Sequence, residues 1–370
     1  MKKSLFRLTM FLCVATLVVG CSDNKTMTIN GVVNIHDAQG TTVYLYNYGP
    51  GDLLDSAVVV DGTFTFSGNY GSDVILQITT AVNYYGFCIA EKGKVYINLV
   101  TDSLSGTPLN NQLGAYNRDI LSINNSYMVR LDEMRTQSKT IDPTDTAAVN
   151  ALKAEYNSMR DEMFGEMYAK AQALYEGNKD NILGAYAFSQ LMSQYETLPE
   201  IEAALSDASP IVRDFRPVQM YLERMRSVDA TAVGHHYVDI KGLSYPDYND
   251  LSLGELIDGK VALVDFWASW CGPCREEIRE NLIRVYEKYK KQGLQVVGVD
   301  ISDEIAKHDA AVKDLGITYP QLIDTTDVAA FSYGVSGIPE ILLIDKEGNI
   351  VARGLRGNAI EQAVKEQLAK

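Results

Sequence analysis

"VALVDFWASWCGPCREE", residues 261–277, is the stretch of this chain that decides its fold. Its first six residues are apolar except for Asp265, and two cysteines separated only by Gly-Pro follow shortly after. A short apolar run of this kind predicts a buried strand. From Cys274 to Tyr289, apolar residues recur at steps of four and three, which predicts a helix. The cysteines Cys271 and Cys274 are therefore expected where the strand leads into the helix.

The sequence that follows alternates between strand and helix as far as the C-terminus. Such alternation, ended by a hairpin, predicts a mixed sheet with helices on both faces. We therefore expect an α/β fold over residues 234–370. The further strands are expected at residues 294–300, 339–345 and 350–354, and the further helices at residues 303–316 and 358–370, the last capped by Asn358.

Residues 228–260 precede this alternating region and are interpreted as a linker. They contain the pair His235 and His236, which could indicate a metal site. Zinc sites combine such residues with cysteines or carboxylates at set spacings, and neither a cysteine nor a trio of carboxylates lies nearby in the sequence. We interpret the pair as solvated.

The front of the chain, residues 27–110, has the pattern of a β domain. The segments "TTVYLYNY" and "GTFTFSG" are rich in β-formers, and Asp61-Gly62 is a typical hairpin turn. Several short strands at this spacing predict a small sandwich or barrel. Cys88 lies in one of the expected strands and is interpreted as a buried apolar side chain.

Residues 111–230 are predicted to be helical. The side chains of one stripe recur at steps of three and four, and we interpret them as core packing rather than as a ligand-binding face. Asp142-Pro143 is a candidate helix start and Gly177 a candidate stop, with further helices beginning near Asn181 and Pro199. The stripe consists of Leu152, Tyr156, Met159, Met163 and Met167.

The first twenty residues have the layout of an export signal. A basic start is followed by an apolar stretch and a small residue, Gly20, before Cys21. The ending "VVGC" resembles the lipobox of bacterial lipoprotein signals, which implies cleavage before Cys21 and attachment of lipid to its thiol. A membrane-spanning anchor or an ordinary signal are the alternatives. The formal charge of −15 over 370 residues argues against nucleic acid as a partner.

A zinc site, a haem attachment site and a structural disulfide are the alternatives to a redox-active dithiol at Cys271 and Cys274. A zinc site needs four ligands, and the chain has no second pair of cysteines at that spacing. Covalent haem needs histidine after the second cysteine, where Arg275 stands. A purely structural disulfide across two residues would close a very small loop and remove little unfolded-state entropy. A dithiol that cycles between reduced and oxidised forms remains, with no metal and no further cofactor.

The expected position of the pair assigns a role to each sulfur. Cys271 would lie at the helix N-terminus, where free N–H groups and the helix dipole favour a thiolate that attacks a client disulfide. Cys274, one turn further, would resolve the mixed disulfide. Asp265, buried beneath, would have a raised pKa and exchange a proton with Cys274. Trp267 and Trp270 are expected to flank the site.

The segment "FWASWCGPC" resembles the active-site signature of the thioredoxin family. The order of elements after it resembles the extracytoplasmic TlpA/ResA-like branch, and "GIPEILLID" resembles the cis-proline loop. The resemblance implies that the Ile338-Pro339 bond is cis, that it lies beside Cys271, and that the backbone near Ile338 pairs with an extended client. The client-binding residues that it implies are Trp270, Gly272, Pro273, Ile338 and Pro339. Residues 27–110 resemble an uncharacterised β domain found ahead of such domains.

Three positions depart from the family pattern. Arg279 replaces the usual helix proline, which puts the helix kink in doubt, and no lysine accompanies Asp265. Glu340 follows the cis-proline, and it could select basic or metal-bound partners or be a solvated loop charge.

The predicted function is that of a lipid-anchored thiol–disulfide oxidoreductase in the cell envelope, facing the periplasm. Its expected partners are protein clients, a membrane reductase that donates electrons, and the membrane that holds the lipid, with the outer membrane slightly favoured. Two alternatives are a peroxidase of the related peroxiredoxin group and a surface ligand-binding lipoprotein with an accessory redox domain.

Overall fold

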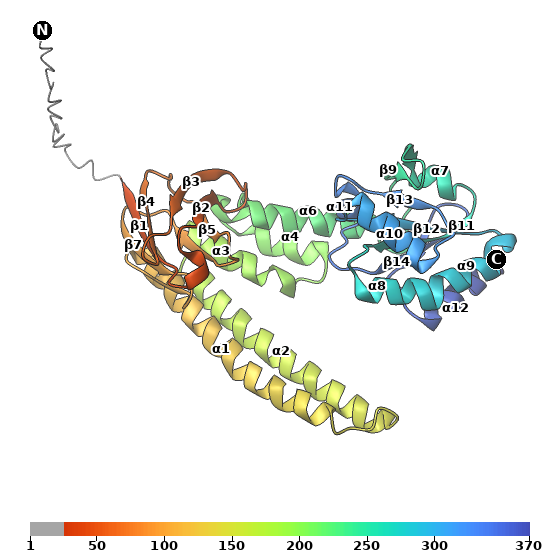
Figure 1. The fold of residues 1–370 in the computed structure, drawn as a ribbon, viewed down its shortest axis with the longest axis horizontal. Coiled ribbons are helices and arrows are strands. Elements are labelled where there is room, and N and C mark those ends of the chain that lie inside the picture. The colour runs from red at the N-terminus through yellow and green to blue at the C-terminus, as the bar shows by residue number, and fades with distance from the viewer. Residues whose placement is uncertain (1–25) are drawn as a thin grey trace, which may run out of the picture. The chain divides into compact units, whose positions relative to one another are not determined.

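The computed structural model describes residues 26–370, which form two compact units that meet between Leu183 and Gly184 (Figure 1). The expected signal, residues 1–20, and the expected lipidation site, Cys21, lie outside the described residues. Within residues 26–370, no helix combines the length and the apolar character that crossing a bilayer requires.

The first unit begins with a β-sandwich. Its two four-stranded sheets have the strand orders β4-β1-β7-β8 and β3-β2-β5-β6, so the sandwich, rather than a barrel, is the form adopted. In β4, alternate residues point into the core, and Phe64 and Phe66 are both buried there. The strands are β1 (Met27–Val32), β2 (Thr42–Asn47), β3 (Leu53–Val58), β4 (Thr63–Gly68), β5 (Ile75–Thr80), β6 (Tyr85–Ile89), β7 (Gly93–Asn98) and β8 (Ser103–Ser105), with the short helix η1 (His36–Ala38) after β1.

The Asp61-Gly62 turn forms, but it does not make the expected two-stranded hairpin. Both residues have positive φ, 50° and 71°, and Val60 and Thr63 pair across the turn. The strands on either side nevertheless pair elsewhere, β3 with β2 and β4 with β1. The turn therefore carries the chain from one layer of the sandwich to the other.

Two long helices, α1 (Pro108–Ser138) and α2 (Thr146–Glu176), complete the first unit. Met159 of α2 is buried with Ile123, Tyr127 and Met134 of α1, which confirms that the methionine stripe is core packing. Leu152, Met163 and Met167 pack against this cluster, whereas Tyr156 is exposed.

The start of α2 was predicted wrongly and its end correctly. Asp145, not Asp142, is the N-cap and accepts a hydrogen bond from the Ala148 N–H at 3.0 Å. Asp142 instead closes the preceding turn by accepting from the Thr144 N–H at 2.9 Å, so Pro143 lies before the helix. Gly177 is the C-cap.

Asn110 joins helix α1 to the sandwich. Its buried side chain accepts from the Ile89 N–H at 2.8 Å and donates to the Ile89 carbonyl at 2.9 Å, so it completes the edge of β6. A buried backbone group that loses such a partner costs about 1–3 kcal/mol.

We predict that Asn110→Ala lowers the free energy of unfolding of the first unit by about 3 kcal/mol, because it leaves both Ile89 backbone groups buried and unpaired. Urea unfolding followed by circular dichroism measures this. Asn111→Ala, which alters an exposed neighbour that bonds only Gly106, is the matched control and should change stability far less. Equal effects of the two substitutions would contradict the assignment.

The second unit contains short helices followed by a seven-stranded mixed sheet of order β10-β9-β13-β12-β11-β14-β15. Strands β11, β12 and β13 are parallel, and β14 runs antiparallel beside β11. The helices before the sheet are α3 (Ile182–Leu191), η2 (Met192–Gln194), α4 (Leu198–Ser206), α5 (Pro210–Arg213) and α6 (Arg216–Ala230). The strands are β9 (Lys241–Ser244), β10 (Asp250–Ser252), β11 (Val261–Trp267), β12 (Leu294–Asp300), β13 (Gln321–Ile323), β14 (Glu340–Ile344) and β15 (Ile350–Ala352).

Helices cover both faces of this sheet, as predicted. Figure 1 shows α9 and α12 on one side of it and α7 on the other, and the two buried clusters divide in the same way. The odd-numbered residues of β11, such as Leu263, face α8, α10 and α12, while even-numbered ones, such as Val264, face α7 and α11. The helices are α7 (Leu253–Ile257), α8 (Gly272–Glu277), η3 (Ile278–Leu282), α9 (Ile283–Tyr289), η4 (Lys290–Gln292), α10 (Ile305–Leu315), α11 (Val328–Ser332) and α12 (Asn358–Leu368).

The interpretation of residues 228–260 as a linker was wrong. Strands β9 and β10 form a hairpin at the edge of the sheet, and β9 pairs with β13. Both strands are too short, at four and three residues, to show a period in the sequence. The N-cap of α12 was also misplaced by one residue, since Gly357 precedes the helix and Asn358 begins it.

Candidate active site

The cysteine pair lies where β11 gives way to α8. All seven residues of β11 are buried, and the chain then turns so that the Cys271 N–H donates to the Ala268 carbonyl at 3.1 Å. Cys271 is the N-cap of α8, and its Sγ accepts a hydrogen bond from the Cys274 N–H at 3.2 Å. The two sulfurs are joined in a disulfide, with the Cα atoms 5.3 Å apart. This is the oxidised form of the pair.

The two sulfurs differ in their access to solvent. Cys271 retains 5% exposure at the floor of a pocket of about 580 Å³, whereas Cys274 is fully buried. Trp270, 63% exposed, forms part of the wall. A partner arriving through the pocket can therefore reach only the first sulfur. Among the lining residues are Trp270, Gly272, Pro273 and Ile338, four of the five expected in client binding.

The fifth, Pro339, follows a cis peptide bond. Ile338-Pro339 is cis, as the family resemblance implied, and the Ile338 carbonyl oxygen lies 3.8 Å from Cys271 Sγ. The turn that carries the cysteines and the cis-proline loop, which are distant in sequence, thus meet at Cys271 Sγ.

Asp265 is completely buried on the same face of the sheet as Leu263 and Ile341, which belong to the cluster that contains both cysteines. Neither of its carboxylate oxygens has a hydrogen-bond partner among residues 26–370. Burial raises the pKa of Asp265 to about 8, and Glu277 adds to the rise while Arg356 opposes it. The carboxyl group can therefore gain or lose a proton near neutral pH.

Sequence reasoning missed the groups that surround Asp265. Glu277 lies three residues after Cys274, a helical spacing that could have indicated it, and it accepts from the Gly357 N–H at 3.1 Å. Arg356 donates to the Pro339 carbonyl. The buried Tyr319 hydroxyl also has no hydrogen-bond partner among the described residues, and the Asp265 charge helps to raise the pKa of that hydroxyl. No sequence pattern connects Arg356 or Tyr319 with the cysteines.

The loop after β12 holds the segment that precedes the cysteines. Asp303 accepts from the Ser269 N–H at 2.6 Å, and the Trp270 indole donates to the Ser302 carbonyl at 3.1 Å. Asp300, at the end of β12, is nearly fully buried, and burial together with the Asp303 charge raises its pKa to about 8. This second perturbed carboxyl group was not predicted.

Where Arg279 replaces the usual helix proline, the structure has a π-helical turn, η3, which joins α8 to α9. Two expectations about other neighbouring residues need correction. Glu340 is not a free charge in the groove, because it pairs with Arg353 at 2.8 Å in a largely buried position. Trp267 does not flank the opening; it is fully buried and donates to Gln321 at 3.0 Å.

The remaining candidate residues, Cys88, His235 and His236, occupy positions that fit a structural rather than a chemical role. Cys88 is fully buried in β6, and burial raises the pKa of its thiol to about 12, as expected for a core residue. His235 and His236 are exposed. Within residues 26–370, no three histidine, cysteine or acidic side chains converge as metal ligands would.

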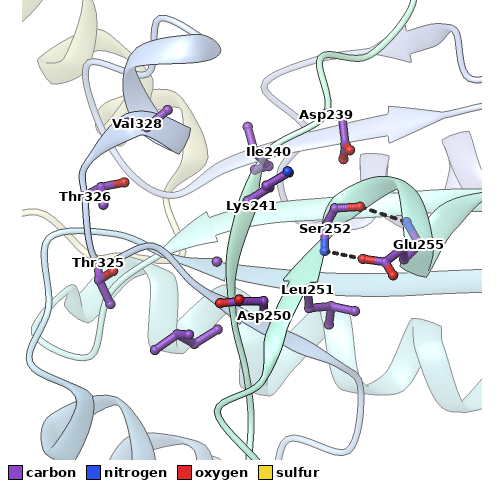
Figure 2. Close-up of a pocket in the computed structure, with 12 residues that line it drawn as sticks. Asp239, Ile240, Lys241, Asp250, Leu251, Ser252, Glu255, Thr325, Thr326 and Val328 are labelled. Atoms are coloured by element: carbon purple, nitrogen blue, oxygen red, sulfur yellow. Dashed lines mark hydrogen bonds between the residues drawn. The ribbon is translucent and has the colours of Figure 1, made fainter.

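A second pocket, of about 630 Å³, lies at the β9–β10 edge of the sheet (Figure 2). Ser252 and Glu255 cap the first turn of α7 beside it through reciprocal hydrogen bonds. Asp239, Lys241 and Asp250 also line it, and none of the predicted site residues does. The predicted site residues that line a pocket lie in the one at Cys271.

Two protein-family models and several known proteins match parts of this chain. The model of the AhpC/TSA family matches residues 233–353, and that of the domain of unknown function DUF4369 matches residues 27–113. The thiol:disulfide interchange protein HelX of Rhodobacter capsulatus is 34% identical over 115 residues, which are 31% of this chain and 62% of HelX. The thiol-disulfide oxidoreductase ResA of Geobacillus kaustophilus is 30% identical over 126 residues, which are 34% of this chain and 67% of that ResA.

Solved structures similar to this chain include the thioredoxin domain of a thiol-disulfide oxidoreductase from Bacteroides vulgatus, at 32% identity and a TM-score of 0.35, with 36% of this chain and 96% of that chain covered. The chain spans 62% of the length of HelX and of ResA from Geobacillus thermodenitrificans. The match to the Geobacillus kaustophilus protein extends to two thirds of it. On this evidence the chain belongs to the TlpA/ResA-like thiol-disulfide oxidoreductases of the thioredoxin family, and a DUF4369 domain precedes the thioredoxin-like one.

Proposed function

We propose that the chain exchanges disulfides with protein clients through Cys271 and Cys274, in the direction that reduces the client. The observation that carries this proposal is the difference between the two sulfurs, one at the floor of an open pocket and one fully buried a turn further along the helix. In that arrangement a client can contact Cys271 Sγ, whereas Cys274 Sγ can react only with Cys271 Sγ.

The reaction would begin from the reduced dithiol. The Cys271 thiolate, which the Cys274 N–H and the helix dipole stabilise, attacks a client disulfide and forms a mixed disulfide, and one client thiolate leaves. The Cys274 thiolate then attacks Cys271 Sγ, so that the second client thiolate leaves and the Cys271–Cys274 disulfide forms. Two electrons pass to the client. A membrane reductase would return two electrons to the protein.

Asp265 would act as the base for the second step. Cys274 is too buried to lose its proton to solvent, and Asp265, with a pKa of about 8, is a buried carboxyl group on the same face of the sheet. The carboxylate accepts the Cys274 proton before resolution and returns it when the disulfide is reduced.

Anchoring in the cell envelope belongs to the same proposal. The signal-like residues 1–20 and the lipobox ending at Cys21 support export and lipid attachment. Facing the periplasm would bring the protein to substrates with disulfides.

We predict that Cys274→Ser traps clients as mixed disulfides, because the resolving sulfur is missing while the attacking one remains. Purification of this variant under non-reducing conditions, with release by dithiothreitol, measures the trapping. Cys271→Ser is the matched control and should trap none. If the two variants behave alike, or if the wild type does not reduce insulin, the proposed reaction is wrong.

We predict that Asp265→Asn slows insulin reduction about 100-fold near neutral pH, because the resolving step loses its base. In the wild type, turnover should rise towards pH 8 as Asp265 loses its proton, and the variant should lack this rise.

The same substitution has a predicted effect on stability. Because the folded-state pKa is raised from 3.8 to about 8, the folded state binds more protons than the unfolded one in this range, so this contribution to stability is complete below pH 4 and declines until pH 8. As the pH rises between 4 and 8, the free energy of unfolding of the wild type should therefore fall relative to that of Asp265→Asn by about 1.4 kcal/mol per pH unit. Urea unfolding at pH 5 and pH 7 measures it, with the exposed Asp258→Asn as control. A pH-independent difference would show that Asp265 ionises normally.

A peroxidase is the second candidate, because the matching family model is that of the AhpC/TSA family. Trp267 and Ser269 occupy the approach where peroxidases of that group place proline and threonine, so we predict that peroxide consumption per thiol does not exceed that of free cysteine. A stopped-flow measurement with hydrogen peroxide decides between the candidates, and faster consumption would favour the peroxidase.

A further inference from the structure

The residue after the cis-proline takes part in a shielded ion pair. Glu340 and Arg353 contact each other through Oε1 and Nε at 2.8 Å, and their side chains are only 17% and 19% exposed. Charges with so little access to water need well-placed partners, so the pair holds its two chain segments in a defined relation.

The guanidinium of Arg353 also donates hydrogen bonds to two other segments, at Tyr333 and at Thr231. Nη2 donates to the Tyr333 carbonyl at 2.5 Å, and Nη1 donates to the Thr231 hydroxyl at 2.8 Å and to the Thr231 carbonyl at 3.2 Å. Tyr333 and Glu340 bracket residues 334–339, part of which lines the pocket at Cys271. One planar side chain therefore ties both ends of the cis-proline segment.

Thr231 brings helix α6 into this arrangement. It is the C-cap of α6 and is fully buried. The last carbonyls of a helix lack partners within it, and they attract a cation because the C-terminal end is negative. Arg353 supplies both the donors and the charge.

The cis-proline segment also lies directly against α6. Gly334 has a positive φ of 60°, and a Cβ there would be 2.4 Å from Val228 Cγ2 and 2.9 Å from the Arg224 carbonyl oxygen. The backbone thus approaches the helix more closely than any side chain would allow. Helix α6 lies before residues 233–353, the range that matches the family model, so this contact adds to the thioredoxin-like domain an element from outside that range.

We propose that Arg353 is a positioning residue that couples α6 to the backbone on which the client binds. By fixing the segment from Tyr333 to Glu340 on the end of α6, it sets where the Ile338 carbonyl stands, 3.8 Å from Cys271 Sγ. The inference rests on the proposed function, in which an extended client pairs with this backbone. Removal of the guanidinium weakens client binding and leaves the reactivity of Cys271 unchanged.

The test uses the full chain with three variants, Arg353→Met, Arg353→Lys and Thr231→Val. A fourth variant, Arg284→Met, is the control for the loss of an arginine ion pair, because Arg284 is exposed and pairs with Glu361. Two substrates separate binding from chemistry: insulin, which presents an extended backbone, and 5,5′-dithiobis(2-nitrobenzoate), which has none. For Arg353→Met we expect KM for insulin to rise about tenfold, with kcat and the rate on the small disulfide within about twofold. Thr231→Val should raise KM about threefold, Arg353→Lys should recover part of the loss, and Arg284→Met should change nothing.

Unchanged KM for insulin in Arg353→Met and Thr231→Val would overturn the inference, and so would an equal loss on both substrates. If Arg353→Met does not fold, Thr231→Val decides, because it keeps the pair with Glu340. Hydrogen exchange at residues 334–338 separates this inference from the proposed function: faster exchange in Arg353→Met supports the positioning role even if wild type does not reduce insulin. Unchanged exchange contradicts it.

Discussion

The hydrogen bond from the Cys274 N–H to Cys271 Sγ, at 3.2 Å, is the interaction on which the rest of the site depends. It exists because Cys271 is the N-cap of α8, where the first N–H groups of the helix have no partner within the helix. The same turn puts one sulfur at the pocket and the other in the core. The difference in solvent access between two identical side chains thus comes from backbone geometry.

Two buried carboxyl groups lie in the strands that lead to the site, at a cost in stability. Asp265 and Asp300 stand on neighbouring strands, and burial raises the pKa of each to about 8. An apolar residue at either position would avoid the cost of burying a charge. Groups that can change protonation near neutral pH are of use where sulfurs gain and lose protons, which agrees with the base role proposed for Asp265.

The pocket is built from three loops that the chain holds by different means. The β11–α8 turn is fixed by its own helix, and the loop after β12 binds it through Asp303 and the Ser302 carbonyl. The cis-proline segment is held from outside by Arg353 and by the end of α6. Loops at the carboxyl ends of parallel strands are the usual place for a site in α/β sheets, and here an adjoining helix steadies one of them.

The sequence alone determined the strand-to-helix junction at the cysteines, the burial of Asp265, the β-rich front domain and the packing of the methionine stripe, because each follows from local periodicity or from one short motif. The choice of a sandwich over a barrel was made only by the pairing of the strands. The partners of those residues were decided only by the tertiary structure. Glu340 could not be assigned to Arg353, nor Arg353 to Thr231, because these contacts join residues up to 122 positions apart. Strands β9 and β10 escaped prediction since three or four residues carry no period, and only pairing with β13 makes them part of the sheet.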